Sequence, residues 1–164
     1  FSTQNLAREC NDLEELKIIE RAGFTLEEAA SQFAMLTRVE NLPDSFLVIR
    51  KQEDAKIVGF CVGPVSAKRY INDELFAQSV PNPLNGGFQT ILSIAVHPNY
   101  RGLGFGKYIL LEFVKKAQQA NRHGVTLTCL SHMIPFYESC GFKNEGIAES
   151  VHAGEVWYNM NIDF

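Results

Sequence analysis

The sequence has no long hydrophobic run, no excess of positive charge and no paired-cysteine motif. A membrane-spanning helix needs about 20 consecutive apolar residues, and no stretch of this 164-residue chain approaches that length. The chain carries 15 Lys and Arg against 19 Asp and Glu, giving a formal net charge of −4. This balance argues against a nucleic-acid-binding protein and is compatible with a cationic substrate. Neither nucleic acid nor a membrane is therefore expected as a partner.

The four cysteines, Cys10, Cys61, Cys129 and Cys140, show no CxxC spacing and form no zinc pattern with histidine. No metal site is expected from them. Cys129 also has no His or Asn at a recognisable partner spacing, which favours a buried apolar role over a nucleophile. No secretory signal peptide is visible. We expect reduced, buried thiols in a cytoplasmic protein.

One continuous α/β pattern runs through residues 1–164, which suits a single domain. Helices are expected over residues 12–22, from a capping box of Thr25 and Glu28 to about 39, over 104–119 and over about 135–140. Strands are expected over 46–50, 57–65, 90–96, 125–129, 143–148 and 155–162. Residues 66–88 form a long irregular connection, and loops of that length are often functional.

A glycine-rich segment after the strand at 90–96 is the most informative part of the chain. Gly102, Gly104 and Gly106 let the backbone approach a ligand without a Cβ in the way. The first N–H groups of the following helix lack intrahelical partners, and the helix dipole adds partial positive charge there. Arg101 and Lys107 add full charges. The segment therefore favours a pyrophosphate, and the alternative is a strand-to-helix turn without a ligand.

The spacing separates this segment from two other nucleotide-binding patterns. No Ser or Thr follows Lys107, as a P-loop requires, and the alternating glycines do not fit the dinucleotide fingerprint. The pattern Arg-x-x-Gly-x-Gly over residues 101–106 resembles the acyl-CoA signature of the GCN5-related N-acetyltransferase (GNAT) superfamily. Residues 136–142, with Phe136, Tyr137 and Glu138 before Gly-Phe, resemble a second segment of that superfamily.

The order of the expected elements is similar to the GNAT fold along essentially the whole chain. The resemblance implies an α/β (α+β) fold with a single central, mixed, mostly antiparallel twisted sheet, two splayed parallel strands, and helices on both faces. Acetyl-CoA would lie between the splayed strands, at 89–96 and 125–129. Its pantetheine arm would pair with the backbone of Ile94, Ala95 and Val96, with N–H groups near Ile94 as oxyanion donors. Its pyrophosphate would contact Arg101, Gly102, Leu103, Gly104, Phe105, Gly106 and Lys107.

Within the superfamily, the chain is similar to the arylalkylamine (serotonin) N-acetyltransferase branch and its polyamine-acetylating relatives. The run at residues 42–47 and the Ala95-Val96-His97 strand end carry this resemblance. It implies an amine pocket lined by Phe24 and Trp157, and a mobile substrate loop at 66–88. It also implies that Tyr137 protonates the CoA sulfur as general acid. The alternative is that Phe136 and Tyr137 only pack a short helix against the sheet.

The general base is not identified by the sequence. The two base histidines of the serotonin enzyme correspond to Thr90 and Leu92, and neither side chain can act as a base. Thr90 and Ser93 could order water. His97 is expected to cap or pack. His132 lies near the expected substrate entrance, although an exposed loop histidine is the commoner explanation.

The sequence thus predicts an enzyme that transfers the acetyl group of acetyl-CoA to a primary amine by direct attack in a ternary complex. The expected acceptor is a small arylalkylamine or a polyamine. Two alternatives stay open: a protein or peptide N-acetyltransferase, and a non-catalytic acyl-CoA-binding domain. Either a monomer or a homodimer fits the sequence.

Overall fold

The computed structural model describes residues 1–5, 12–23, 32–150 and 152–164. The helices within these residues are α1 (Asp12–Gly23), α2 (Gln32–Asn41), α3 (Phe105–Gln119) and α4 (Ile134–Ser139). The strands are β1 (Ser2–Asn5), β2 (Phe46–Arg50), β3 (Ile57–Val62), β4 (Val65–Ser66), β5 (Phe88–Ile91), β6 (Ser93–Val96), β7 (Gly124–Cys129), β8 (Lys143–Ile147) and β9 (Tyr158–Asp163). Short 3-10 turns, η1 to η5, begin at Pro43, Asp73, Pro98, Ser131 and His152.

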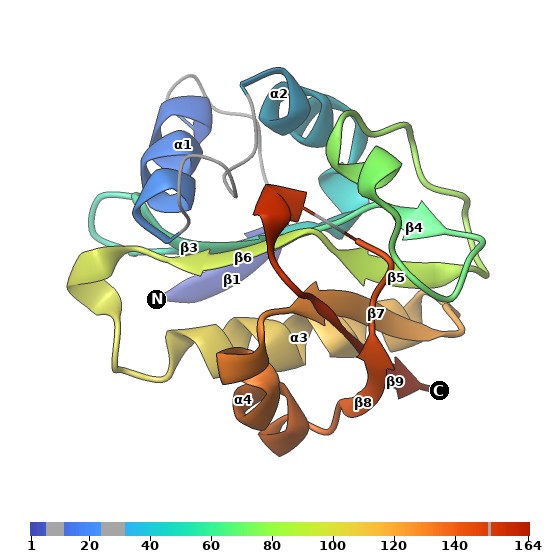
Figure 1. Cartoon of the computed structure of the whole chain (residues 1–164). Helices are drawn as coiled ribbons and strands as arrows, with labels where there is room; N and C mark the ends of the chain where they lie inside the picture. Colours follow the sequence, from blue (N-terminus) through green and yellow to red (C-terminus); the bar gives the residue numbers. More distant parts are fainter. Residues whose placement is uncertain (6–11, 24–31, 151) are drawn as a thin grey trace.

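The strands form two sheets with the orders β1-β2-β3-β6 and β4-β5-β7-β9-β8. Among the described strands, β5 and β7 are parallel and the other neighbours are antiparallel. Helices α1 and α2 lie on one side of the strands, and α3 and α4 lie on the other (Figure 1). The α/β class, the splayed strands and the helices on both faces are confirmed. The sheet differs from the single sheet expected, because it divides into two.

The division occurs at a β-bulge in the chain between β5 and β6. The Leu92 N–H donates to the Val62 carbonyl at 2.9 Å, and Ser93 pairs with the same Val62. Two residues of one strand therefore oppose one of the other, which bends the strand. Before the bulge, β5 pairs with β7 as far as Ile91 and Leu127. After it, β6 pairs with β3 instead, so β6 and β7 separate.

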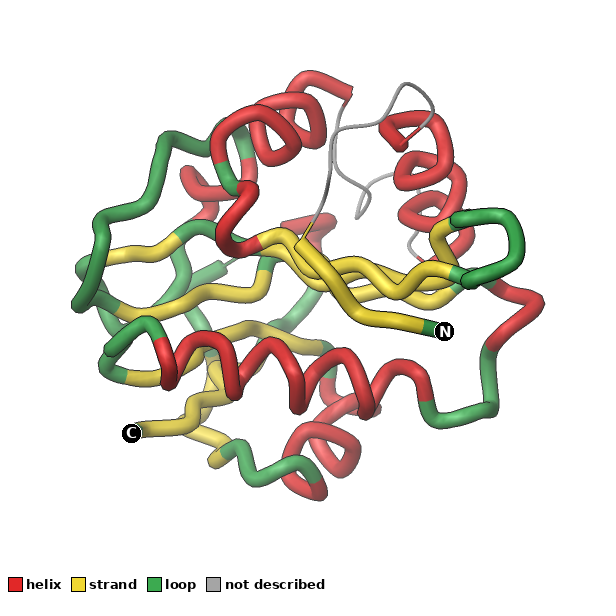
Figure 2. The backbone as a smooth tube through the Cα atoms, turned by 180° about the vertical axis from the view of Figure 1, so that it is seen from behind, coloured by secondary structure: helices red, strands yellow, loops and turns green. Residues whose placement is uncertain are grey.

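The core lies on both sides of the strands. Helix α3 buries Ile109, Leu110, Phe113 and Ala117 against the sheets, at the spacing of one helical face. Figure 2 shows from behind how α3 runs along the strands. On the other side, α1 and α2 bury a second cluster, which contains Leu16, Ile19, Met35, Phe46 and Phe60. Each large apolar side chain buried in this way stabilises the fold by about 1.5–3 kcal/mol.

A buried polar network connects α1 and α2 to the first residue of β6. The Ser93 hydroxyl donates to Glu20 Oε1 at 2.9 Å and accepts from Arg38 Nη1 at 3.1 Å. All three side chains are buried. Burial lowers the pKa of the Arg38 guanidinium, and the charge of Glu20 acts in the opposite direction. The network fixes two helices relative to the bulge.

Several expected elements end elsewhere than predicted. The strand expected over 57–65 stops at Val62, because Gly63 and Pro64 interrupt it before β4. A Cβ at Gly63 would lie 2.0 Å from the Thr90 carbonyl oxygen, so this crossing requires glycine. The last strand begins at Tyr158 instead of residue 155, and β1 was not expected. The capping box of Thr25 and Glu28 lies outside the described residues.

The remaining helices and strands lie close to their expected positions, as α3, β7 and α4 show. The long connection at 66–88 begins at the last residue of β4 and contains the turn η2 (Asp73–Phe76). Of the helices that the structure describes, none has the length and apolar character needed to cross a membrane.

Replacing Ser93 with Ala should lower the free energy of unfolding by about 1–3 kcal/mol, because buried Arg38 and Glu20 each lose a hydrogen bond. Urea denaturation measures this. Ser139→Ala is the matched control, since Ser139 is exposed and its hydroxyl contacts only the Phe136 carbonyl of its own helix and the adjacent Cys140 sulfur. Equal stability of the two variants would contradict the structural role assigned to the network.

Candidate functional site

A pocket of about 350 Å³ lies where β6 and β7 separate. Sixteen residues form its wall, and they are mainly apolar: Phe76, Ile91, Leu92, Ile94, Ala95, Val96, Gly106, Leu127, Thr128, Cys129, Leu130, His132, Met133, Phe136, Tyr137 and Trp157. None of these described wall residues is Asp, Glu, Lys or Arg. The described part of the chain also has no group of three or more His, Cys, Asp or Glu side chains arranged to hold a metal ion.

One wall of the pocket is the open edge of β6. The His97 N–H donates to the Val58 carbonyl at 2.7 Å, in the same register as the β3–β6 pairs. Main-chain groups alternate in direction along an antiparallel strand. Ser93 and Ala95 therefore face β3, whereas the N–H and C=O groups of Ile94 and Val96 face away from it. Since β6 ends its sheet, the Ile94 N–H and C=O and the Val96 N–H can bind an extended ligand as an added strand.

The glycine-rich loop lies next to this edge and leads into α3. Gly102 and Gly104 have φ angles of +76° and +86°, in the left-handed region that favours glycine. A Cβ at either position would meet no protein atom within 4 Å. Gly104 is the N-cap of α3 without a side-chain cap, so the N–H groups of the first turn stay available. The loop is an exposed cradle suited to an anion.

Arg101 makes contacts that the sequence did not indicate. Its Nε donates to the Val96 carbonyl at 3.2 Å, and its Nη2 donates to the Ala22 carbonyl at 3.0 Å. Arg101 thus connects the end of α1 to the outward-facing edge of β6. Lys107 is exposed on the first turn of α3, where its charge adds to that of the helix dipole.

Tyr137, the expected general acid, lies on α4 in the pocket wall and is 6% exposed. Its ring packs edge-on against Phe136 and Phe142, with centroids 5.1 and 5.9 Å away. Burial raises the pKa of its phenol, and nearby cysteines, Cys129 foremost, raise it further. The phenol is therefore protonated at neutral pH, as a proton donor must be.

Another part of the pocket wall is aromatic. Trp157, expected in the amine pocket, lies in the wall together with Phe76 and Leu92, whereas its neighbour Tyr158 does not. Phe76 belongs to the connection at 66–88, which the sequence singled out only as a loop. Phe24, the other residue expected there, lies outside the described residues.

Two segments that carry these aromatic residues are joined by polar contacts. The Ser150 hydroxyl donates to Asp73 Oδ1 at 2.5 Å. This hydrogen bond connects the chain segment before Trp157 with the turn that carries Phe76. Farther out, Arg69 forms ion pairs with Glu145 at 2.7 Å and Asp163 at 2.8 Å. Hydrogen bonds from Arg69 lower the pKa of both carboxyls. The 66–88 connection is thus held on β8 and β9.

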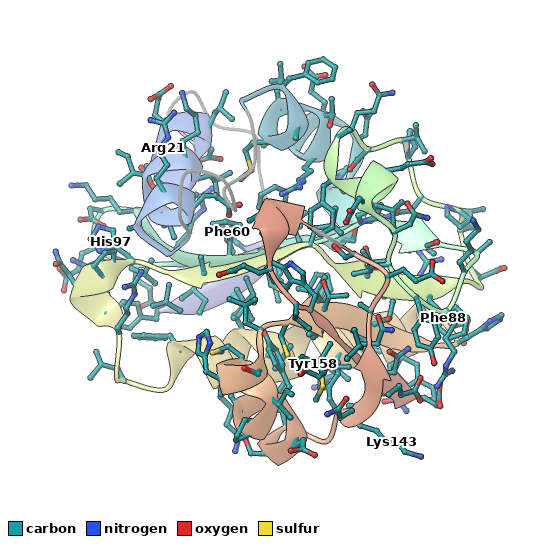
Figure 3. The ribbon with its side chains drawn as sticks, in the orientation of Figure 1. Arg21, Phe60, Phe88, His97, Lys143 and Tyr158 are labelled. Atoms are coloured by element: carbon teal, nitrogen blue, oxygen red, sulfur yellow. The ribbon has the colours of Figure 1, made fainter. Side chains whose placement is uncertain are left out.

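The two positions that correspond to the base histidines of the serotonin enzyme, Thr90 and Leu92, offer no base in the structure. Thr90 is fully buried and its hydroxyl donates to the Pro64 carbonyl at 2.6 Å, while Leu92 lines the pocket. His97 accepts a hydrogen bond from the Asn99 N–H at 3.1 Å and caps η3, as expected. Figure 3 shows that His97 lies far across the molecule from Phe88, which is the first residue of β5. His132, by contrast, lies in the pocket wall.

Comparison with known families agrees with this geometry. Residues 43–144, well over half of the chain, match the acetyltransferase (GNAT) domain model. The chain therefore belongs to the GNAT acetyltransferase family.

Individual relatives cover parts of the chain. An uncharacterized N-acetyltransferase, ycf52, of Porphyra purpurea is 36% identical over 74 residues, which are 45% of this chain and 41% of that protein. Glucosamine 6-phosphate N-acetyltransferase of Schizosaccharomyces pombe is 33% identical over 63 residues, 38% of this chain and 57% of that protein. The chain thus spans about half the length of these curated relatives. They support the superfamily and do not single out the arylalkylamine branch.

Solved structures share the fold over the full length. The crystal structure of Arabidopsis thaliana NAA60 in complex with acetyl-CoA matches with a TM-score of 0.74 at 20% identity, covering 99% of each chain. At that identity the match supports the fold alone.

Gly104→Ala should raise the Kd for acetyl-CoA about tenfold or more, because its Cβ would enter the space offered to a phosphate. Calorimetric titration measures this. Gly146→Ala is the matched control: Gly146 also has a left-handed φ, +98°, with nothing within 4 Å of a Cβ. Both variants carry a backbone strain of about 1 kcal/mol, so equal binding by the two would rule out the cradle.

Proposed function

We propose that this protein is an N-acetyltransferase that transfers the acetyl group of acetyl-CoA to a primary amine on an apolar, aromatic-sized body. The observation that carries the proposal is the pocket itself. Its one side combines an open strand edge with a glycine-rich anion cradle, and its other side is an uncharged aromatic wall.

In this proposal, the cosubstrate follows the surfaces already described. The pyrophosphate binds to the loop N–H groups around Gly102 and Gly104 and to the first turn of α3. The amide groups of the pantetheine arm pair with the outward-facing Ile94 carbonyl and Val96 N–H, since the Val96 carbonyl already accepts from Arg101. This arrangement brings the thioester to the pocket where β6 and β7 diverge.

The reaction needs an oxyanion donor and a proton donor from the protein. The neutral amine attacks the thioester carbonyl carbon, and the oxygen gains negative charge. A main-chain N–H at the open edge, such as that of Ile94, donates a hydrogen bond to this oxygen. The carbon–sulfur bond then breaks, and Tyr137 donates its phenolic proton to the leaving thiolate. The phenol is protonated at neutral pH even at its ordinary pKa of about 10, and burial raises that pKa further.

The wall also favours one class of acceptor. Phosphate recognition normally uses Arg or Lys, and a polyamine with several cations normally requires carboxylates. Neither kind of side chain occurs among the described wall residues. Phe76, Leu92 and Trp157 instead offer apolar and aromatic contact area. The wall therefore supports an arylalkylamine over a polyamine or an amino sugar phosphate.

Thiol release from acetyl-CoA tests the proposal with phenethylamine, tryptamine, spermidine, glucosamine 6-phosphate and a lysine peptide as acceptors. We expect the aryl amines to have the highest kcat/KM, by about tenfold or more. A preference for spermidine, the sugar phosphate or the peptide would contradict the proposed acceptor class. No release with any amine, despite acetyl-CoA binding, would favour a non-catalytic domain.

Tyr137→Phe should lower kcat by about 100-fold or more while the Kd for acetyl-CoA stays unchanged, because only proton donation is lost. Tyr158→Phe, next to the pocket wall but not in it, should leave kcat unchanged. Since burial raises the pKa of Tyr137 above the ordinary phenol value of about 10, kcat of the unmodified enzyme should not fall between about pH 7 and 9. An unchanged kcat in Tyr137→Phe would refute the assignment.

A further inference from the structure

We infer that His132 is the general base that removes the first proton from the acceptor ammonium. This inference rests on the proposed function and identifies the residue that the sequence left unassigned. It is carried by the position of His132 in the pocket wall and by the protonation states of the other wall residues.

The acceptor needs a base. An alkyl ammonium has a pKa of about 10.4, as in lysine, so only about one molecule in 2,500 is neutral at pH 7. Only the neutral amine has the lone pair that attacks the thioester. An enzyme that uses the abundant ammonium form therefore needs a group in or next to the pocket that accepts one proton for each turnover.

Three of the described wall residues can titrate: Cys129, His132 and Tyr137. Burial raises the pKa of the Cys129 thiol to about 11 and also raises that of the Tyr137 phenol. Both groups hold their protons at neutral pH and cannot accept another. Imidazole is the side chain that offers a free lone pair in this range.

The polar groups behind the wall are engaged elsewhere. The Thr90 hydroxyl donates to the Pro64 carbonyl, and the Ser93 hydroxyl donates to Glu20. Glu20 is 2% exposed and does not line the pocket. A relay through these groups would have to break the network that connects α1 and α2 to β6.

The place of His132 suits a base that must be reset after each turnover. It lies in η4 (Ser131–Met133), between the end of β7 and α4, five residues before Tyr137. The base and the acid thus both come from the segment between β7 and β8, which contains η4 and α4. His132 is also exposed to solvent, so its ring can face the pocket and still pass a proton to water.

The proton balance of the step is complete. The ammonium transfers one proton to an imidazole nitrogen of His132, and the amine lone pair forms the carbon–nitrogen bond. The carbon–sulfur bond breaks, and the thiolate takes the proton of Tyr137. The second proton of the amine returns to the Tyr137 phenolate. One proton per turnover leaves from His132 to solvent, and the products are the amide and coenzyme A.

The pH dependence of kcat/KM for His132→Gln tests the inference, with phenethylamine or the panel amine of highest kcat/KM. The unmodified enzyme should lose activity below neutrality and show a plateau above it. His132→Gln should lose this plateau and rise continuously toward about pH 10, where the free amine forms. At pH 7 its kcat/KM should fall about 100-fold or more, with the Kd for acetyl-CoA unchanged.

His123→Gln is the matched control, because His123 is also exposed but lies outside the pocket wall. Its profile should equal that of the unmodified enzyme. In His132→Ala, added imidazole should increase the rate in proportion to its concentration, which a structural role of His132 would not produce.

The outcomes separate this inference from the function beneath it. If the unmodified protein is active and His132→Gln keeps the plateau, His132 is not the base and the proposed function stands. If the unmodified protein releases no thiol with any amine, both proposals fail.

Discussion

The separation of β6 from β7 is the constraint on which the rest of the structure depends. Two strands that continued as parallel neighbours would satisfy each other's main-chain groups and leave no space between them. The bulge at Leu92 and Ser93 moves β6 to a different sheet, where it pairs with β3 alone among the described strands. The main-chain groups of Ile94 and the Val96 N–H are then available to a ligand, while the Val96 carbonyl accepts from Arg101. The pocket and the loop that leads into α3 follow from this divergence.

The divergence is held in place by buried polar contacts. Ser93, directly after the bulge, bonds Glu20 of α1 and Arg38 of α2. Burying charged groups is unfavourable unless each is hydrogen-bonded, so this network admits few alternative positions of the helices. Ser150 and Asp73 connect the segments that carry Trp157 and Phe76. The strand edge and the aromatic wall residues are therefore held by separate sets of contacts.

Local signals in the sequence predicted the parts that local physics determines. The apolar spacing of α3 and the glycines at 102 and 104 predicted the helix and the turn before it, and the structure has both. The bulge was not predicted, because it depends on the pairing of Leu92 with distant Val62. Polar β1 forms through its pairing with β2, and its own sequence has no strand pattern.

The candidate site was predictable to a similar degree. Ile94, Val96, Gly106, Tyr137 and Trp157 were singled out from the resemblance, and the structure brings them to one pocket. Phe76 reaches the wall through a turn inside a long connection, where no periodicity marks it. The contacts of Arg101 with α1 likewise depend on tertiary packing.

Residue-resolved amide hydrogen exchange with and without saturating acetyl-CoA tests the central claim most directly. When acetyl-CoA is bound, the N–H groups of Ile94 and Val96 should exchange at least about tenfold more slowly, because the ligand pairs with the open edge. Those of Ser93 and Ala95, which face β3, should not change. Unchanged exchange at Ile94 and Val96 with acetyl-CoA bound would show that the cosubstrate does not use the edge exposed by the bulge.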